Sequence, residues 1–423
     1  MRPDIAPPYA VASSIGRTRG IRLGIRAQLL GSQVFGQVVP IAVIPFLTRR
    51  LTPEQMGHYQ VALSIALVSI PFAIFQADVF VPVARDAAEV RALERRAVLA
   101  TLIVGVISSL LAAVLASGSR IETAITTFLL LAALSLTAVT NAQLIRKEDM
   151  PKLVQRNLLG GVSVAAIQLA CVMLSPTAIS LGIGMLMGRM LCQGLLRSAK
   201  AYAPHHNAAK VPQDFWRVIS GAAGNALGTF ASQMPTLVVA PVYSAAAAGY
   251  LGLGQRVVGA PTGLIGQGVN QIIVADASAI VRSGRHGLWP GLRRQVVLLV
   301  SVSLAAAAAA AIIVPPITPW LFGPSWAPAD VYIQILALPM CLQLAAVPMV
   351  PLMAMLGLQR AMLAIQIFRI VGILACIAVG FSLSFGMTAT IILISGTWTL
   401  AYLGTIGLAV IAMRNYDAQR PPR

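Results

Sequence analysis

The stretch GYLGLGQRVVGAPTGLIGQGVNQII, from Gly249 to Ile273, decides the fold class because it is long and apolar enough to cross a lipid bilayer. Its 25 residues include seven glycines and a single charged residue, Arg256. Lipid penalises a charge at such a depth, so Arg256 needs a wet or polar surface to face. The stretch therefore predicts a membrane helix that also contributes to a polar site.

The rest of the chain repeats this apolar pattern. Its 423 residues are 57% hydrophobic and only 10% charged. Runs of about 18 or more residues with few charges predict membrane helices. We expect twelve spans, within a range of eleven to fourteen, at residues 27–47, 58–83, 97–117, 122–144, 157–174, 177–196, 218–243, 250–275, 295–315, 330–354, 361–381 and 387–412. The predicted fold class is an all-α polytopic membrane protein.

The charge of the chain follows the positive-inside rule and does not indicate nucleic-acid binding. Lys and Arg exceed Asp and Glu by 31 to 13, which gives a net charge of +18. With the N-terminus placed in the cytoplasm, 25 basic residues fall in cytoplasmic segments, 3 in outside loops and 3 within spans. Because basic residues concentrate on the cytoplasmic side, this alternation predicts that both chain ends are cytoplasmic.

The longest cytoplasmic connection divides the chain into two halves that we expect to surround a central cavity. The expected units are a basic N-tail (1–26), a first six-helix half (27–196), a linker (197–217), a second six-helix half (218–412) and a C-tail (413–423). Pro40 and Pro45 in the first span match Pro235 and Pro241 in the seventh. An even number of helices per half predicts parallel repeats, and matched proline breaks are typical of a transport site between repeats. The alternative is that prolines are simply commoner in membrane helices than in soluble ones.

Three stretches, one of which contains Gly249–Ile273, carry a family resemblance. They are PFLTRRLTPEQMGHYQVALSI (Pro45–Ile65), AAAAGYLGLGQRVVGAPTGLIGQGVNQII (Ala245–Ile273) and LFGPSWAPADVYIQILALPM (Leu321–Met340). Together they resemble bacterial flippases for lipid-linked polysaccharide repeat units, within the multidrug/oligosaccharidyl-lipid/polysaccharide exporter superfamily. The resemblance covers nearly the whole chain in order and spacing. One departure is Gln76-Ala77-Asp78, where family members often carry a basic-aromatic-acidic triplet and this chain keeps only the acid.

The resemblance implies a flippase that moves an undecaprenyl-diphosphate-linked oligosaccharide from the cytoplasmic to the periplasmic leaflet, for surface polysaccharide biosynthesis. It implies alternating access in the bacterial inner membrane, with the lipid bilayer and a polysaccharide polymerase of the same pathway as partners. The chain has no phosphate-binding glycine loop with Lys and Ser/Thr, so we expect an ion gradient or the substrate gradient, and not ATP hydrolysis, to drive transport.

Three expected spans each hold one arginine: Arg189, Arg256 and Arg369. At a helix centre each costs about 2.5–3.5 kcal/mol, so such residues are kept where they face a wet cavity and bind a ligand. Arginine stays charged and can donate two parallel hydrogen bonds to one phosphate. These three, with Arg26 at the start of the first span, are the candidate substrate-binding residues. The alternatives are snorkelling to a membrane surface and, for Arg26, positive-inside anchoring.

Asp78 is the candidate ion-coupling residue. It lies about six residues from the inner end of the second expected span. Low-dielectric surroundings raise the pKa of a carboxyl toward neutrality, which would let Asp78 take up and release a proton during transport. The alternative is that Asp78 pairs with a nearby arginine such as Arg85 or marks the membrane boundary.

Catalytic and metal-binding classes are disfavoured. The four cysteines lie far apart and the four histidines form no ligand cluster, so we expect no catalytic residue, metal or cofactor. The longest outside segment, Ile317–Ala329, has no acid, Lys, Arg or His, which disfavours a membrane-embedded polymerase or ligase. Its Trp320 and Trp326 are expected to be interfacial anchors. The other alternative is efflux of organic cations, which favour acidic and aromatic walls. The chain has only one clear intramembrane acid and 6% aromatic residues, which disfavours this alternative.

Overall fold

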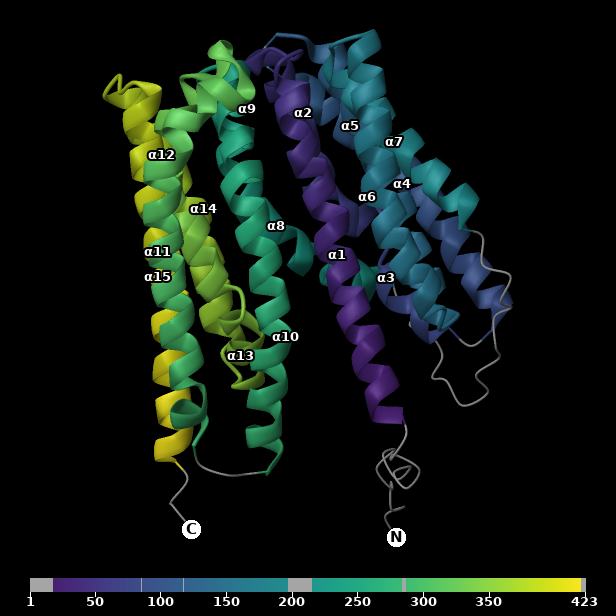
Figure 1. Cartoon of the computed structure of the whole chain (residues 1–423), viewed down its shortest axis with the longest axis vertical. Helices are drawn as coiled ribbons and strands as arrows, with labels where there is room; N and C mark the ends of the chain where they lie inside the picture. Colours follow the sequence, from purple (N-terminus) through teal and green to yellow (C-terminus); the bar gives the residue numbers. More distant parts are fainter. Residues whose placement is uncertain (1–17, 85, 117, 197–214, 284–286, 420–423) are drawn as a thin grey trace.

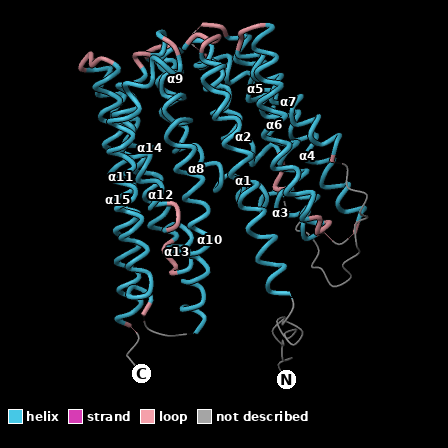
Figure 2. The backbone as a smooth tube through the Cα atoms, viewed as in Figure 1, coloured by secondary structure: helices cyan, strands magenta, loops and turns pink. Residues whose placement is uncertain are grey.

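The computed structural model describes residues 18–84, 86–116, 118–196, 215–283 and 287–419, and every regular element within them is a helix. The first group of helices is α1 (Thr18–Thr48), α2 (Pro53–Ala73), α3 (Ala77–Phe80), α4 (Ala87–Leu115), α5 (Arg120–Arg146), α6 (Met150–Leu174) and α7 (Ala178–Leu195). The second group is α8 (Phe215–Val242), α9 (Ala245–Gly254), α10 (Ala260–Ser283), α11 (Leu288–Phe322), α12 (Ala329–Ala346), α13 (Met349–Met355), α14 (Gln359–Ser382) and α15 (Met387–Ala418). Figure 2 shows that most loops lie at the two ends of these helices.

The two groups stand side by side and lean toward each other at one end (Figure 1). At that end, α2 of the first group packs against α8 and α9 of the second. Toward the opposite end, where α1 begins and α15 ends, the ribbons of the two groups diverge (Figure 1). The expected linker, residues 197–217, lies largely outside the described residues, and so does most of the expected N-tail. The unit boundaries therefore stay a prediction.

The fold class expected from the sequence is confirmed. Within the described residues, eleven helices are long and apolar enough to cross a membrane. The remaining expected span, 218–243, is the continuous helix α8, which is less apolar because it carries Asn225, Thr229, Ser232 and Gln233. The span expected at 250–275 is longer than predicted, because α9, a short π-helix (Gln255–Gly259) and α10 run on without a break from Ala245 to Arg282.

The inner end of the second expected span was predicted wrongly. The prediction continues this helix to residue 83, but α2 ends at Ala73. Pro71 has no N–H to donate within the last turn, and Phe75 and Gln76 then adopt left-handed conformations with φ of 51° and 54°, which end a helix. The short helix α3 and a 3-10 turn (Val81–Val83) follow. Asp78 therefore lies in α3, beyond the spanning helix.

The turns before α2 and α9 begin these two helices in the same way. The Thr52 side chain accepts from the Gln55 N–H, and the Gln55 side chain accepts in return from the Thr52 N–H, which caps α2. The Ser244 side chain caps α9 by accepting from the Ala247 N–H. The two capped helices, α2 and α9, pack against each other.

Glycine allows α2 and α9 to touch through their backbones. A Cβ added at Gly57 would overlap the Ala245 carbonyl, and one added at Gly249 would overlap the Pro53 carbonyl. One turn further in, a Cβ on Gly252 would lie 2.6 Å from Gln60 Cγ. Small residues permit this close approach in membrane helices, so the glycines close the molecule at the end where α9 lies.

Trp326 also joins the two groups there. It lies in the 3-10 turn Pro324–Trp326, its side chain is 0% exposed, and its Nε1 donates to the Thr48 carbonyl at the end of α1 over 3.0 Å. The expectation that Trp326 is an interfacial anchor is therefore wrong, because its ring fills the core between the groups. Trp320, by contrast, is 75% exposed.

Gly57→Val should destabilise the protein, because the added side chain meets backbone that cannot move aside. We expect a loss of about 1–3 kcal/mol or more, typical of overpacking, measured as a lower midpoint in thermal unfolding of the purified protein. Gly407→Val is the matched control, because a Cβ at Gly407 on α15 meets nothing within 4 Å. Equal midpoints for the two variants would contradict the glycine contact.

Candidate functional site

A polar cavity lies between the two groups, directly inward of the glycine contact. Its volume is about 310 Å³. Its lining comes from α2, α8, the π-helix, α10, α12, α14 and α15, and consists of Gln60, Leu63, Leu67, Ser232, Gln233, Gln255, Arg256, Gly259, Ala260, Met340, Gln343, Arg369, Trp398 and Tyr402. Two of the four predicted binding arginines, Arg256 and Arg369, thus line one cavity, and none of the lining residues is acidic.

Arg256 lies in the π-helical segment of the long helix α9–α10. A π-bulge widens the helix locally and is frequent at functional sites. The half-buried guanidinium lies over the Tyr59 ring of α2, with Cζ 4.7 Å from the ring centroid, and Nη1 donates weakly to Met56 Sδ at 3.9 Å. Arg256 has no carboxylate partner among the described residues, so its charge is balanced only by a ring face and a sulfur.

Neutral hydrogen bonds join the two groups across the cavity. Gln60 Nε2 on α2 donates to Gln255 Oε1 over 3.1 Å, and Gln255 Nε2 donates on to Thr236 Oγ1 at 3.3 Å. Ser64 Oγ on α2 donates to Gln233 Oε1 on α8 over 3.0 Å. Neutral bonds of this kind contribute about 0.5–1.5 kcal/mol each, because water replaces them when they open. These bonds hold the two groups in position across the cavity but are weak enough to open.

Arg369 is the most deeply buried charge of the cavity. Its side chain is only 7% exposed. Nη1 donates to Gln366 Oε1 one turn earlier on α14, over 3.2 Å, while Nε and Nη2 are buried without a partner. Its Cζ lies 5.9 Å from the Trp398 ring centroid and 5.4 Å from that of Tyr402. The Arg369 guanidinium therefore keeps two donor nitrogens without an acceptor beside the cavity, which is costly for a buried charge.

The other predicted site residues lie outside this cavity. Arg189 on α7 is packed beside Gly160 of α6, within the first group. Arg26 belongs to α1, but its side chain lies outside the described residues. Asp78 on α3 has an exposed side chain and does not line the cavity. Their roles stay predictions.

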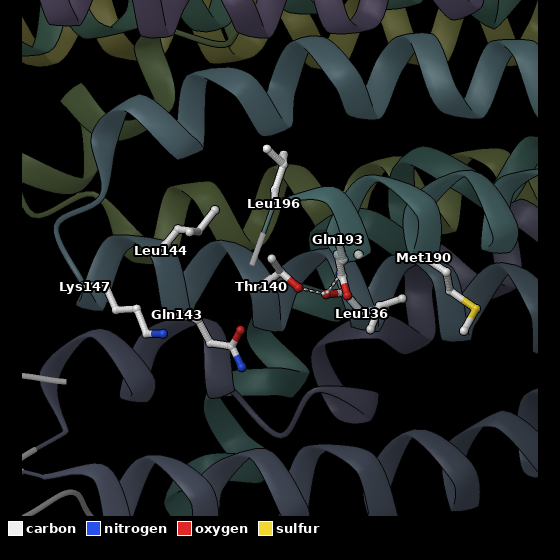
Figure 3. Close-up of a pocket in the computed structure, with 9 residues that line it drawn as sticks. Leu136, Thr140, Gln143, Leu144, Lys147, Met190, Gln193 and Leu196 are labelled. Atoms are coloured by element: carbon white, nitrogen blue, oxygen red, sulfur yellow. Dashed lines mark hydrogen bonds between the residues drawn. The ribbon is translucent and has the colours of Figure 1, made fainter. Parts of the chain in front are cut away.

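A second polar pocket of about 440 Å³ lies between α5 and α7 (Figure 3). Its polar side chains bond within the protein. Thr140 Oγ1 and Gln193 Nε2 both donate to the Leu136 carbonyl, and Gln143 Nε2 donates to Glu94 Oε1 over 2.7 Å. With those donors already paired, this pocket offers a ligand less than the central cavity does.

Sequence reasoning missed the aromatic part of the site. Trp398 and Tyr402 are four residues apart on α15 and so share one face of that helix, yet nothing in this spacing tells them from ordinary core residues. Gln60 and Tyr59 were hidden in the same way, since only packing against α9 shows that they meet Gln255 and Arg256.

Comparisons with known proteins agree with this architecture. The sequence profile of a family described as polysaccharide biosynthesis protein matches residues 93–331, more than half of the chain. No curated protein matches the chain significantly.

Several solved transporters share the fold. An inward-facing multidrug resistance MATE family transporter of the MOP superfamily has a TM-score of 0.63 and 13% identity, covering 96% of this chain and 97% of that chain. The lipid II flippase MurJ, in an inward closed conformation, has a TM-score of 0.64 and 12% identity, covering 94% and 90%. An outward-facing MATE family transporter has a TM-score of 0.51 and 13% identity, covering 95% and 96%. At these identities the likeness is one of fold.

Arg369→Met should leave thermal stability unchanged or higher while it impairs function. Replacing a buried charge that lacks a counter-ion by an apolar side chain of similar length removes a desolvation cost. Gln366→Leu should instead destabilise, by about 1.5–3 kcal/mol, because it strips the buried charge of its acceptor. The double variant should recover the loss. A lower unfolding midpoint for Arg369→Met than for Gln366→Leu would show that the arginine is a structural element.

Proposed function

Since the chain belongs to the polysaccharide biosynthesis protein family, we propose that it is a flippase for an undecaprenyl-diphosphate-linked oligosaccharide. It works in the bacterial inner membrane with both chain ends in the cytoplasm, and carries its substrate to the periplasmic leaflet for surface polysaccharide biosynthesis. The fold of MOP superfamily transporters supports transport as the activity.

The observation that carries the proposal is the uncompensated positive charge of the central cavity. Arg256 and Arg369 line it without a carboxylate, and the free donors on Arg369 point to an acceptor-rich ligand. A diphosphate supplies both negative charge and several acceptor oxygens. The Gln343 amide adds a hydrogen-bonding group that suits a sugar, and the Gln60 and Gln255 amides become available to it when the bond between them opens.

The arrangement of the two groups supports alternating access. They are closed at the end with the glycine contact and diverge at the end where α1 begins and α15 ends (Figure 1). With that second end in the cytoplasm, substrate enters the cavity from the cytoplasmic side. Release on the other side requires α2 to separate from α8 and α9, which breaks the neutral bonds Gln60–Gln255 and Ser64–Gln233 at low cost.

Two alternatives fit the cavity less well. Efflux of organic cations favours acidic or free aromatic walls, whereas the lining holds two cations, and the Trp398 and Tyr402 rings already face Arg369. A polysaccharide polymerase or ligase needs a general base, and the lining contains no Asp, Glu or His.

Arg256→Ala should nearly abolish export, because it removes a positive charge that the diphosphate meets in the cavity. Arg256→Lys keeps the charge but loses the planar fork, so partial activity should remain. The measurement is the amount of surface polymer, together with the lipid-linked unit that accumulates on the cytoplasmic leaflet, in cells that depend on this protein. An unchanged amount of surface polymer, with the Arg256→Ala protein present at its normal level, would contradict the assignment of this cavity as the substrate site.

Asp78→Asn should change the pH dependence of transport. Protein atoms of α4 and α5 around α3 raise the pKa of the Asp78 carboxyl above its ordinary value by desolvation, although the backbone N–H of Val79 acts the other way. The carboxyl therefore keeps its proton to a higher pH than a free aspartate and becomes charged only as the pH rises through that raised pKa.

If this proton couples to transport, the transport rate in proteoliposomes changes across that pH range in the wild type but not in Asp78→Asn. Asp276→Asn is the control, since Asp276 is another exposed acid outside the cavity. Superimposable profiles for wild type and Asp78→Asn would assign Asp78 a structural role.

A further inference from the structure

Two arginines lie side by side inside the first group, away from the central cavity. Arg156 is on α6 and Arg189 on α7, and Arg189 Nη1 lies beside Gly160, one turn after Arg156, so the two guanidinium charges repel each other. Each lies six residues from the end of its helix, after Met150 and before Leu195, which is about 9 Å along the helix axis. The expected spans 122–144 and 157–174 leave Arg156 in the cytoplasmic connection between them, so this pairing appears only in the structure.

The pair has no counter-charge among the described residues. Arg156 Nη2 donates to the Asn157 side-chain oxygen over 2.5 Å, and no carboxylate bonds either guanidinium. The Nε atoms of both residues are buried without an acceptor. Two like charges held together with unpaired donors are unfavourable in the absence of a ligand, and an anion between them would relieve both problems.

The surroundings of the pair are partly polar. Both side chains are partly exposed. Asn157 Nδ2 donates to Ser32 Oγ on α1 over 3.1 Å, so one amide connects Arg156 to the neighbouring helix. A Cβ at Gly160 would lie 2.9 Å from Arg189 Nη1, so this glycine provides the space for the Arg189 guanidinium.

The pair is also connected with the central cavity. Tyr59, on α2, lies beneath the Arg256 guanidinium, and its hydroxyl contacts Met185 Sδ on α7, one turn before Arg189, at 4.0 Å. The Tyr59 side chain is only 3% exposed. It therefore lies between Arg256 and the helix that carries Arg189.

We propose that Arg156 and Arg189 form a binding site for a phosphate-class oxyanion within the first group, distinct from the central cavity. The two planar guanidinium groups can donate to the oxygens of one phosphate or diphosphate, and a divalent anion neutralises both charges. The ligand is either a free phosphate or the diphosphate of the lipid-linked substrate. Only the second source rests on the proposed function, in which case the pair receives the head group before Arg256 does.

The test measures binding of inorganic diphosphate to the full chain in lipid nanodiscs by calorimetry. The background variant is Arg256→Gln/Arg369→Gln, which removes the charges of the central cavity. A saturable site should remain, and Arg156→Gln or Arg189→Gln should weaken it by about tenfold or more, the loss of at least one charge-assisted hydrogen bond. Absence of the remaining site, or equal affinity after either substitution, overturns the proposal.

Two glycine substitutions test whether misfolding causes the loss of binding. Gly160→Ala pushes only the mobile end of Arg189, so the protein should fold normally and bind diphosphate several-fold more weakly. Gly194→Ala on α7 is the control, because a Cβ there meets nothing within 4 Å. Equal affinity for the two alanine variants would contradict the site.

Competition identifies the anion and its source. Displacement of diphosphate by inorganic phosphate alone assigns a free anion. Displacement by a polyprenyl diphosphate in the nanodisc, where phosphate fails, assigns the lipid head group. Displacement by chloride at the same concentration as phosphate refutes a phosphate-class site. Unchanged export in Arg256→Ala with anion binding at Arg156 and Arg189 intact would show failure of the proposed function alone. Loss of export in Arg256→Ala with no anion binding at the pair would show failure of this proposal alone.

Discussion

The rest of the architecture depends on the backbone contact between α2 and α9. Gly57 and Gly249 have no side chain, so carbonyl groups of one helix meet the backbone of the other. One turn inward, Gly252 faces Gln60, and there the polar lining of the cavity begins with the Gln60–Gln255 bond. The glycine contact therefore closes one end of the molecule and also sets how deep the cavity lies below that end. Any larger residue would separate the walls and move Tyr59 away from Arg256.

The second constraint is positive charge held without a carboxylate. Arg256 faces one aromatic ring, and Arg369 faces two rings and an amide oxygen. Cation–π contacts and a single amide reduce the cost of such a charge but leave it uncompensated. Arg156 has one amide and a like-charged neighbour. Both groups of helices thus bring unsatisfied cations to their interiors, which is unfavourable for stability alone and is the basis for proposing an anionic ligand.

Much of the fold follows from local features of the sequence. Long apolar runs separated by basic loops are sufficient to predict the spans, because an unpaired backbone cannot remain in lipid. The prediction failed where a local signal competes with tertiary contacts. Hydropathy continues past Ala73, but Pro71 and the left-handed Phe75 and Gln76 end α2. Trp326 has the composition of an interfacial anchor, but its ring is buried between the groups and bonds Thr48.

The candidate site was predictable only in part, for a related reason. A charge within an apolar run is visible in a sequence, so Arg256 and Arg369 could be named as ligand candidates. Arg156 could not, since it lies near a helix end where basic residues are common anchors. The partners of all these arginines come from distant segments: Tyr59 is on α2, and Trp398 and Tyr402 are on α15.

The sequence by itself determined that this protein is an all-α membrane protein, which segments span, and which spans carry a charge that lipid would not tolerate. These properties depend on each segment's own composition and on its transfer from water to lipid. Tertiary structure alone decided which charges share a cavity, which pair with each other and which end of the molecule is closed. Those outcomes depend on how helices far apart in the chain pack, and a glycine contact such as Gly57 against Ala245 has no local signature that distinguishes it from the many other glycines of the chain.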